Sequence, residues 1–189
     1  MKLYYIAVLK NSSIQHEYSI FSSKGLFSAT FHHHSLQLLR FITTSVIAEL
    51  ISMQKYDTAF FVDDGDFRLH CWMNNDYPVV VITDKEYPES VALRILEKIV
   101  KQRSFITAEE LGVIFKHYTN PLNDKLYKIK QDLEETKTVL HSNIEKLFRR
   151  GEQLEDIIEK TDQLSLETKT FFKRAKKTNR WCPFLFWWL

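Results

Sequence analysis

Residues 126–178 read LYKIKQDLEETKTVLHSNIEKLFRRGEQLEDIIEKTDQLSLETKTFFKRAKKT. Steps of three and four residues through this stretch meet mostly apolar side chains, and the residues between them are largely Glu, Lys, Asp and Gln. The stepped positions are Leu126, Ile129, Leu133, Thr136, Leu140, Asn143, Leu147, Arg150, Leu154, Ile157, Thr161, Leu164, Thr168, Phe171, Ala175 and Thr178. This seven-residue repeat predicts a helix about 80 Å long with one apolar seam. Such a seam requires partner helices, which indicates association rather than catalysis.

The first 120 residues have a different pattern, which is typical of a mixed domain. Strand-like runs occupy residues 3–10, 17–21, 55–62, 67–73 and 79–83, and helical periodicity occupies 36–53, 89–101 and 108–117, with Ser35 as a candidate N-cap. Short polar turns, such as Asp63–Asp66, join consecutive strands and make neighbours antiparallel. We therefore expect an α+β fold: a five-stranded antiparallel sheet flanked by three helices, followed by the long coiled-coil helix.

The chain divides at Asn120-Pro121, where the pattern changes. The expected organisation is a domain over residues 1–120, a linker over 121–125, the coiled-coil helix over 126–180 and an apolar tail over 181–189. No window anywhere in the chain is expected to reach the roughly 18 apolar residues that a membrane helix requires.

Composition and motifs exclude several functions. A net charge of +2 without a separate basic domain argues against nucleic acid as a partner. The two cysteines, Cys71 and Cys182, lie far apart and indicate a reducing compartment, with Cys71 a small core residue. Residues 32–34 are three adjacent histidines, interpreted as an exposed polar run on a loop because they lack metal-ligand spacing. We find no phosphate loop or nucleophile elbow, and expect no metal, no cofactor and no enzymatic activity.

Arg150 lies in the middle of the seam and is followed by Gly151. An arginine there has two interpretations. Its long side chain could extend out of a loosely packed seam into water. Alternatively, a buried polar layer could fix the register and the number of helices in a bundle.

Residues 147–154, LFRRGEQL, preceded by 135–141, ETKTVLH, resemble the SNARE motif of the R-SNAREs. Asn143, Phe171 and the basic run 173–177 agree with that motif. The runs MKLYYI at 1–6 and VITDKEYP at 81–88 resemble the longin domain of the Ykt-type R-SNAREs, a branch without a membrane helix.

The resemblance implies a function in membrane fusion. It makes Arg150 the central ionic layer of a four-helix bundle formed with three Q-SNARE helices, in ER–Golgi or endosomal transport. The protein would then be cytosolic and peripheral on Golgi, ER or vesicle membranes. The resemblance also implies a profilin-like longin domain that folds back on its own SNARE helix, with Phe41 and Ile42 as candidate contacts. Adjacent helix positions point about 100° apart, so the two cannot both face the sheet, and we expect one of them to make an outward, partner-facing contact.

The C-terminus departs from the Ykt pattern. Members of that branch end in a Cys-Cys-a-a-X sequence, and here Cys182 aligns with the prenylated cysteine while Trp181 replaces the palmitoylated one. Prenylation requires a cysteine fourth from the end, and Phe186 occupies that position. Three alternatives are left open: a different chain end, palmitoylation of Cys182, or direct membrane binding by the apolar tail.

Two other functions fit the same pattern. One is an inhibitory SNARE that assembles without driving fusion. The other is a longin-domain trafficking adaptor with a coiled coil, which would tolerate an apolar residue at position 150.

Overall fold

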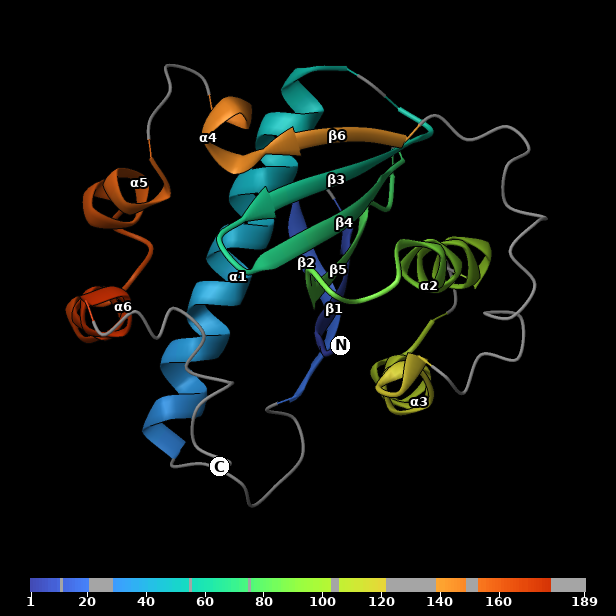
Figure 1. Cartoon of the computed structure of the whole chain (residues 1–189), viewed down its shortest axis with the longest axis horizontal. Helices are drawn as coiled ribbons and strands as arrows, with labels where there is room; N and C mark the ends of the chain where they lie inside the picture. The colour runs from blue at the N-terminus through green and yellow to red at the C-terminus, as the bar shows by residue number, and fades with distance from the viewer. Residues whose placement is uncertain are drawn as a thin grey trace.

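The computed structural model describes residues 1–10, 12–20, 29–54, 56–74, 76–102, 106–121, 139–148 and 153–177 (Figure 1). Six strands are described: β1 (Leu3–Lys10), β2 (Ser13–Ser19), β3 (Thr58–Asp64), β4 (Phe67–Met73), β5 (Val79–Asp84) and β6 (Val139–Asn143). The described helices are α1 (Ala29–Ser52), α2 (Glu89–Gln102), α3 (Ala108–Tyr118), α4 (Ile144–Leu147), α5 (Leu154–Lys160) and α6 (Leu166–Lys177). The predicted α+β class is confirmed.

The strands form one sheet in the order β2-β1-β5-β4-β3-β6. The first five strands pair antiparallel, as predicted, whereas β6 pairs parallel to β3. The expected count of five strands was therefore too low, and the sheet is mixed. The reason is that a five-stranded sheet would leave β3 as an edge with unpaired backbone groups, and β6 supplies their partners.

Two hydrophobic clusters cover opposite faces of the sheet. Along β5, Val80 and Ile82 belong to the cluster that contains α1, whereas Val79 and Val81 belong to the cluster that contains α2 and α3. Cys71 is a buried member of the α1 cluster, as the sequence predicted. Because both faces are covered, the central strands are apolar throughout rather than alternating.

Helix α1 begins earlier than predicted. It starts at Ala29, so Ser35 is an interior residue, 2% exposed, and not an N-cap. The run 32–34 is likewise part of the helix rather than a loop. Residues 29–52 contain neither Gly nor Pro, so nothing in the sequence stops the helix from extending through the histidines.

Contrary to the expectation that no window would qualify, His32–Ser52 of α1 has the length and hydropathy of a membrane-spanning helix, the one such window in the described part of the chain. Its Val46, Ile47 and Leu50 are fully buried in the core beside the sheet. The apolar character of α1 is therefore that of a core helix.

The C-terminal half is not the continuous helix that the heptads predicted. Within residues 139–148 and 153–177 it consists of β6, α4, α5 and α6, and these elements lie against α1 and β3 (Figure 1). A single helix would leave its seam in water, whereas folding back buries much of that seam in the α1 cluster. The repeat specifies which side chains need covering, but not whether another chain or the same chain covers them.

Candidate functional site

The candidate site is the contact between the folded-back segment (β6, α4, α5 and α6) and the surface that receives it (α1 and β3). Figure 1 shows α4, α5 and α6 beside α1, on the opposite side of the sheet from α2 and α3. Contacts join α1 to both α4 and α6, and β3 to both β6 and α4. The segment thus meets the receiving surface at both of its ends.

A polar network that does not involve the folded-back segment links α1 to the sheet. The Arg40 Nε of α1 donates to Glu17 Oε1 of β2 at 2.8 Å, and the Tyr5 hydroxyl of β1 donates to Glu17 Oε2 at 2.5 Å. Burial, together with the charge of Glu17, raises the pKa of Tyr5, so this hydroxyl stays a donor. The Arg40–Glu17 pair links the receiving helix to β2 in addition to the apolar packing of α1 on the sheet.

Strand β6 adds to the outer edge of β3 in register. Leu140 lies opposite Phe60, and His141 opposite Phe61. The buried Phe61 ring makes edge-on contacts with His70, at 4.6 Å between ring centroids, and with His141, at 5.1 Å. The backbone ladder is therefore accompanied by side-chain contacts that also hold β6 at this edge.

Apolar side chains of the segment are buried in the same cluster as α1. The buried residues are Ile144, Leu147, Phe148, Leu154, Ile158, Leu164 and Phe172. Fully burying one such side chain is worth about 1.5–3 kcal/mol, so hydrophobic contact is the main force that holds the segment.

One buried polar contact ties α6 to α1. The Thr168 hydroxyl is buried, donates to Gln37 Oε1 and lies 2.8 Å from His34 Nδ1. Its single proton goes to Gln37, so His34 must be the donor to Thr168. The His34 ring also stacks on Phe171, with centroids 5.7 Å apart.

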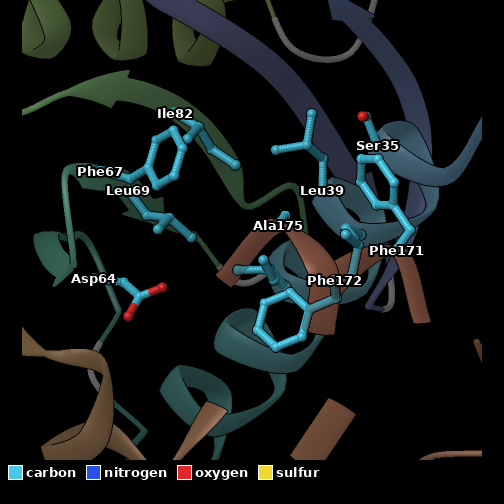
Figure 2. Close-up of a pocket in the computed structure, with 11 residues that line it drawn as sticks. Ser35, Leu39, Asp64, Phe67, Leu69, Ile82, Phe171, Phe172 and Ala175 are labelled. Atoms are coloured by element: carbon cyan, nitrogen blue, oxygen red, sulfur yellow. The ribbon is translucent and has the colours of Figure 1, made fainter. Parts of the chain in front are cut away.

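A small apolar cavity of about 50 Å³ remains between the sheet, α1 and α6. Figure 2 shows Phe67, Leu69 and Ile82 on one side of it, facing Leu39, Phe171 and Phe172. The full lining is Ser35, Leu38, Leu39, Ile42, Asp64, Phe67, Leu69, Ile82, Phe171, Phe172 and Ala175. Phe171, Phe172 and Ala175 of α6 therefore form one wall of the cavity, and α1 and the sheet form the others.

The predicted contacts Phe41 and Ile42 are both buried, 6% and 8% exposed. Ile42 lines the cavity with residues of α6, and Phe41 belongs to the same cluster. Ile42 thus shares this cavity with Phe171, Phe172 and Ala175 of the folded-back segment, and its role as a partner-facing contact stays a prediction.

The structure places the described seam residues in three groups. Leu147, Leu154, Leu164 and Thr168 are buried; Leu140, Ile157, Thr161, Phe171 and Ala175 are half-buried; Asn143 is exposed. Leu126, Ile129, Leu133, Thr136, Arg150 and Cys182 lie outside the described residues.

Four buried contacts were missed by the sequence analysis: Ile144, Phe148, Ile158 and Phe172. Each directly follows a seam position. These apolar neighbours could have been recognised in the sequence. Two adjacent apolar residues at a seam position indicate a broader buried helix face than a simple coiled coil needs. The described residues contain no cluster of three or more His, Cys, Asp or Glu side chains suited to a metal.

Comparison with known proteins agrees with this geometry. Residues 125–188 match the family model described as synaptobrevin. The chain is 32% identical over 202 residues to the synaptobrevin homolog YKT6 of Yarrowia lipolytica, covering 96% of this chain and 98% of the relative. With the same coverage it is 31% identical to the homolog of Candida glabrata and 28% identical to that of Saccharomyces cerevisiae. The chain therefore belongs to the synaptobrevin family and groups with its Ykt6-type members.

Proposed function

We propose that the chain is an R-SNARE that acts in membrane fusion. In its active form residues 126–180 make one helix that assembles in parallel with three Q-SNARE helices, with Arg150 in the central layer. Membership of the synaptobrevin family over the seam region supports this proposal. A planar guanidinium has five donors, which suits it to bind several glutamine oxygens inside a shielded layer.

The observation that carries the regulatory part of the proposal is the burial of the seam in its own chain. Leu147, Leu154 and Leu164 are buried against the first half, and the same side chains would face the partner helices in a bundle. One residue cannot occupy both places, so the folded-back form and the bundle exclude each other. Residues 1–120 therefore lower the apparent affinity for Q-SNAREs, because only the fraction of molecules that is not folded back can bind.

The central layer is tested by Arg150→Ala in the full chain, with Arg149→Ala, one position off the seam, as the matched control. We expect Arg150→Ala to reduce specific, SDS-resistant assembly with three cognate Q-SNARE helices, while circular dichroism shows that helix still forms. Arg149→Ala should assemble like the parent chain. Undiminished specificity and stability of the Arg150→Ala complex would instead favour the trafficking adaptor. Assembly without lipid mixing between reconstituted vesicles would favour the inhibitory SNARE.

We also propose peripheral attachment to the cytosolic face of Golgi, ER or vesicle membranes through residues 181–189 or a lipid on Cys182. Trp181, Trp187 and Trp188 support this, because tryptophan is enriched where protein meets the bilayer surface. Intact-mass measurement of the protein from its native cell separates the alternatives. An unmodified chain, a palmitoyl adduct and a prenyl adduct on Cys182 each give a different mass.

A further inference from the structure

Helices α5 and α6 form a hairpin whose two members touch through charged side chains. A groove of about 320 Å³ separates them, lined by Glu155, Ile158, Glu159, Lys169, Phe172, Lys173 and Lys176. Figure 1 shows the two helices next to each other at the outer side of α1. The apolar Ile158 and Phe172 lie at the base of the hairpin in the core cluster, so its rim is ionic.

Three lysines of α6 all bind α5. Lys173 Nζ lies 2.7 Å from Glu159 Oε1, Lys176 pairs with Glu155, and Lys169 Nζ donates to the Glu159 carbonyl at 3.0 Å. The hydrogen bond from Lys173 lowers the pKa of Glu159. We call Glu155, Glu159, Lys173 and Lys176 the charge clasp.

The clasp exists only while the chain is bent between α5 and α6. Its paired residues are 14 and 21 positions apart, as the numbering of Glu159–Lys173 and Glu155–Lys176 gives. In a straight helix those spacings would be about 21 Å and 32 Å. The lysines must therefore lose these partners when the segment extends.

The three lysines also share one face of α6. Positions 169, 173 and 176 follow each other by four and three residues, which places them along one side of a helix. The sequence continues with Lys177 and Arg180 into the aromatic tail that begins at Trp181. A basic helix face followed by tryptophans is suited to an anionic bilayer, where lysines meet lipid phosphates and aromatic rings lie at the interface.

We infer that this face of α6 is a binding surface for anionic phospholipid membranes and that Glu155 and Glu159 cover it in the folded-back form. The inference rests on the proposed folding back and adds a membrane-sensitive step to it. The clasp is suited to such an exchange because Lys173 is 60% exposed, and exposed ion pairs in water are weak and screened by salt. An anionic surface can therefore compete for the same ammonium groups.

The test measures binding of the full chain to vesicles of phosphatidylcholine with 30% phosphatidylserine, and to vesicles of phosphatidylcholine alone. The double variant Glu155→Gln/Glu159→Gln removes the cover. The control Asp162→Asn/Glu167→Gln removes the same charge from exposed positions of the same hairpin, outside the clasp. Each lysine near an anionic surface contributes roughly a fivefold factor, and a weak ion pair withholds only part of it, so we expect the clasp variant to bind the anionic vesicles about two- to 25-fold more strongly than the control.

Two further measurements complete the test. Lys173→Gln/Lys176→Gln should lose most of the preference for anionic vesicles, although every variant keeps the same tail. Hydrogen exchange of β6 reports folding back independently of membranes. Equal vesicle binding by the clasp variant and its control, with β6 protected in both, would overturn the covering role alone. An unchanged preference after the lysine substitutions would overturn the membrane surface. Unprotected β6 amides in the parent chain would overturn the folded-back proposal itself.

Discussion

At the scale of single residues, Thr168 carries the polar part of the contact between the two halves. It is a buried hydroxyl on a segment that otherwise docks through apolar side chains, and it serves His34 and Gln37 together. Apolar burial tolerates sliding, whereas a hydrogen-bonded group has one correct position. Thr168 therefore sets where α6 lies along α1.

Thr168→Val should loosen α6 while keeping the shape of the side chain. It leaves the half-buried polar atoms of His34 and Gln37 without their shared partner, which costs about 1 kcal/mol, the lower end of the range for buried groups. We expect amides of α6 to exchange roughly five- to tenfold faster in hydrogen-exchange mass spectrometry. Thr168→Ser, which retains the hydroxyl, should stay near the parent, and equal exchange in the Val variant would show that this contact does not hold α6.

His70 makes stability depend on pH. Burial is the main cause that lowers its pKa from 6.5 to about 3, and its Nε2 lies 2.8 Å from Thr83 Oγ1. Above pH 6.5 the ring is neutral in the folded and the unfolded chain and adds no pH dependence. Below pH 6.5 the unfolded chain binds the proton and the folded chain does not, so stability falls until the pH reaches about 3.

We expect this effect to reach about 2 kcal/mol between pH 6.5 and pH 5, at roughly 1.4 kcal/mol per unit. Urea unfolding at both pH values measures it. His70→Gln, which keeps a polar group toward Thr83, should lose less stability than the parent over the same interval. Identical losses in the two proteins would show that His70 is not the responsible group.

At the scale of elements, the packing of α3 on β2 depends on a glycine. A Cβ on Gly112 would lie 2.8 Å from Cε2 of the Tyr18 ring. That ring also packs on Phe115, with centroids 5.1 Å apart. The absence of a side chain at position 112 therefore lets α3 approach the sheet.

Gly112→Ala should destabilise the domain even though alanine favours helices. Overpacking of this kind costs about 1–3 kcal/mol. Replacing glycine by alanine in a helix gains about 1 kcal/mol, so we expect a net loss of stability of up to about 2 kcal/mol. Chemical unfolding measures the difference. In a Tyr18→Leu background the same substitution should cost less, and an equal cost in both backgrounds would place the strain elsewhere.

The elements also show how far the sequence could predict this fold. Strands β1 and β4 have the predicted bounds, because each is an apolar run ended by clear turn residues. Strand β2 was predicted at 17–21 and is observed at Ser13–Ser19, since a tight hairpin and a register shift between Val8 and Leu9 move the pairing toward the turn. Strand β3 was predicted at 55–62 and is observed at Thr58–Asp64, where its pairing with β4 defines it.

Strand β6 could not be predicted from local pattern. Residues 139–143 continue the heptad repeat, which favours a helix, and only the distant edge of β3 makes them a strand. The candidate site, by contrast, could be predicted in part. The repeat identified residues that need covering, such as Leu147 and Leu154, but their partner on α1 lies about a hundred positions away and has no signal within the repeat.

At the scale of the whole molecule, the proposed function gives one segment two incompatible uses. Folded back, the segment closes the sheet edge and the open side of α1. In the extended form that we propose, it would present the same apolar residues to other helices. The balance between the two states can be shifted from the receiving surface without touching the seam.

Ile42→Asp should shift that balance toward the open form. It places a carboxylate in the cavity beside Phe171 and Phe172, and an unpaired buried charge costs several kcal/mol unless α6 moves away and admits water. We expect exchange in β6 and α6 to rise more than tenfold, and assembly with Q-SNARE helices to become faster.

Ala48→Asp, at an exposed position of the same helix, is the control. Protection of the β1 and β5 amides distinguishes opening of the segment from unfolding of the domain. If β6 and α6 stay as protected as in the parent while the sheet is intact, Ile42 does not contribute to holding the segment.

The parallel pairing of β6 with β3 has one more consequence. When β6 leaves, β3 becomes an edge strand with a row of unsatisfied backbone donors and acceptors. A second open molecule can offer its own β6 to that edge, which is the geometry of a domain-swapped pair. If the chain opens as we propose, opening without Q-SNARE helices at hand would carry a risk of dimerisation that rises with protein concentration, and rapid capture of the extended segment by its partners would limit that risk.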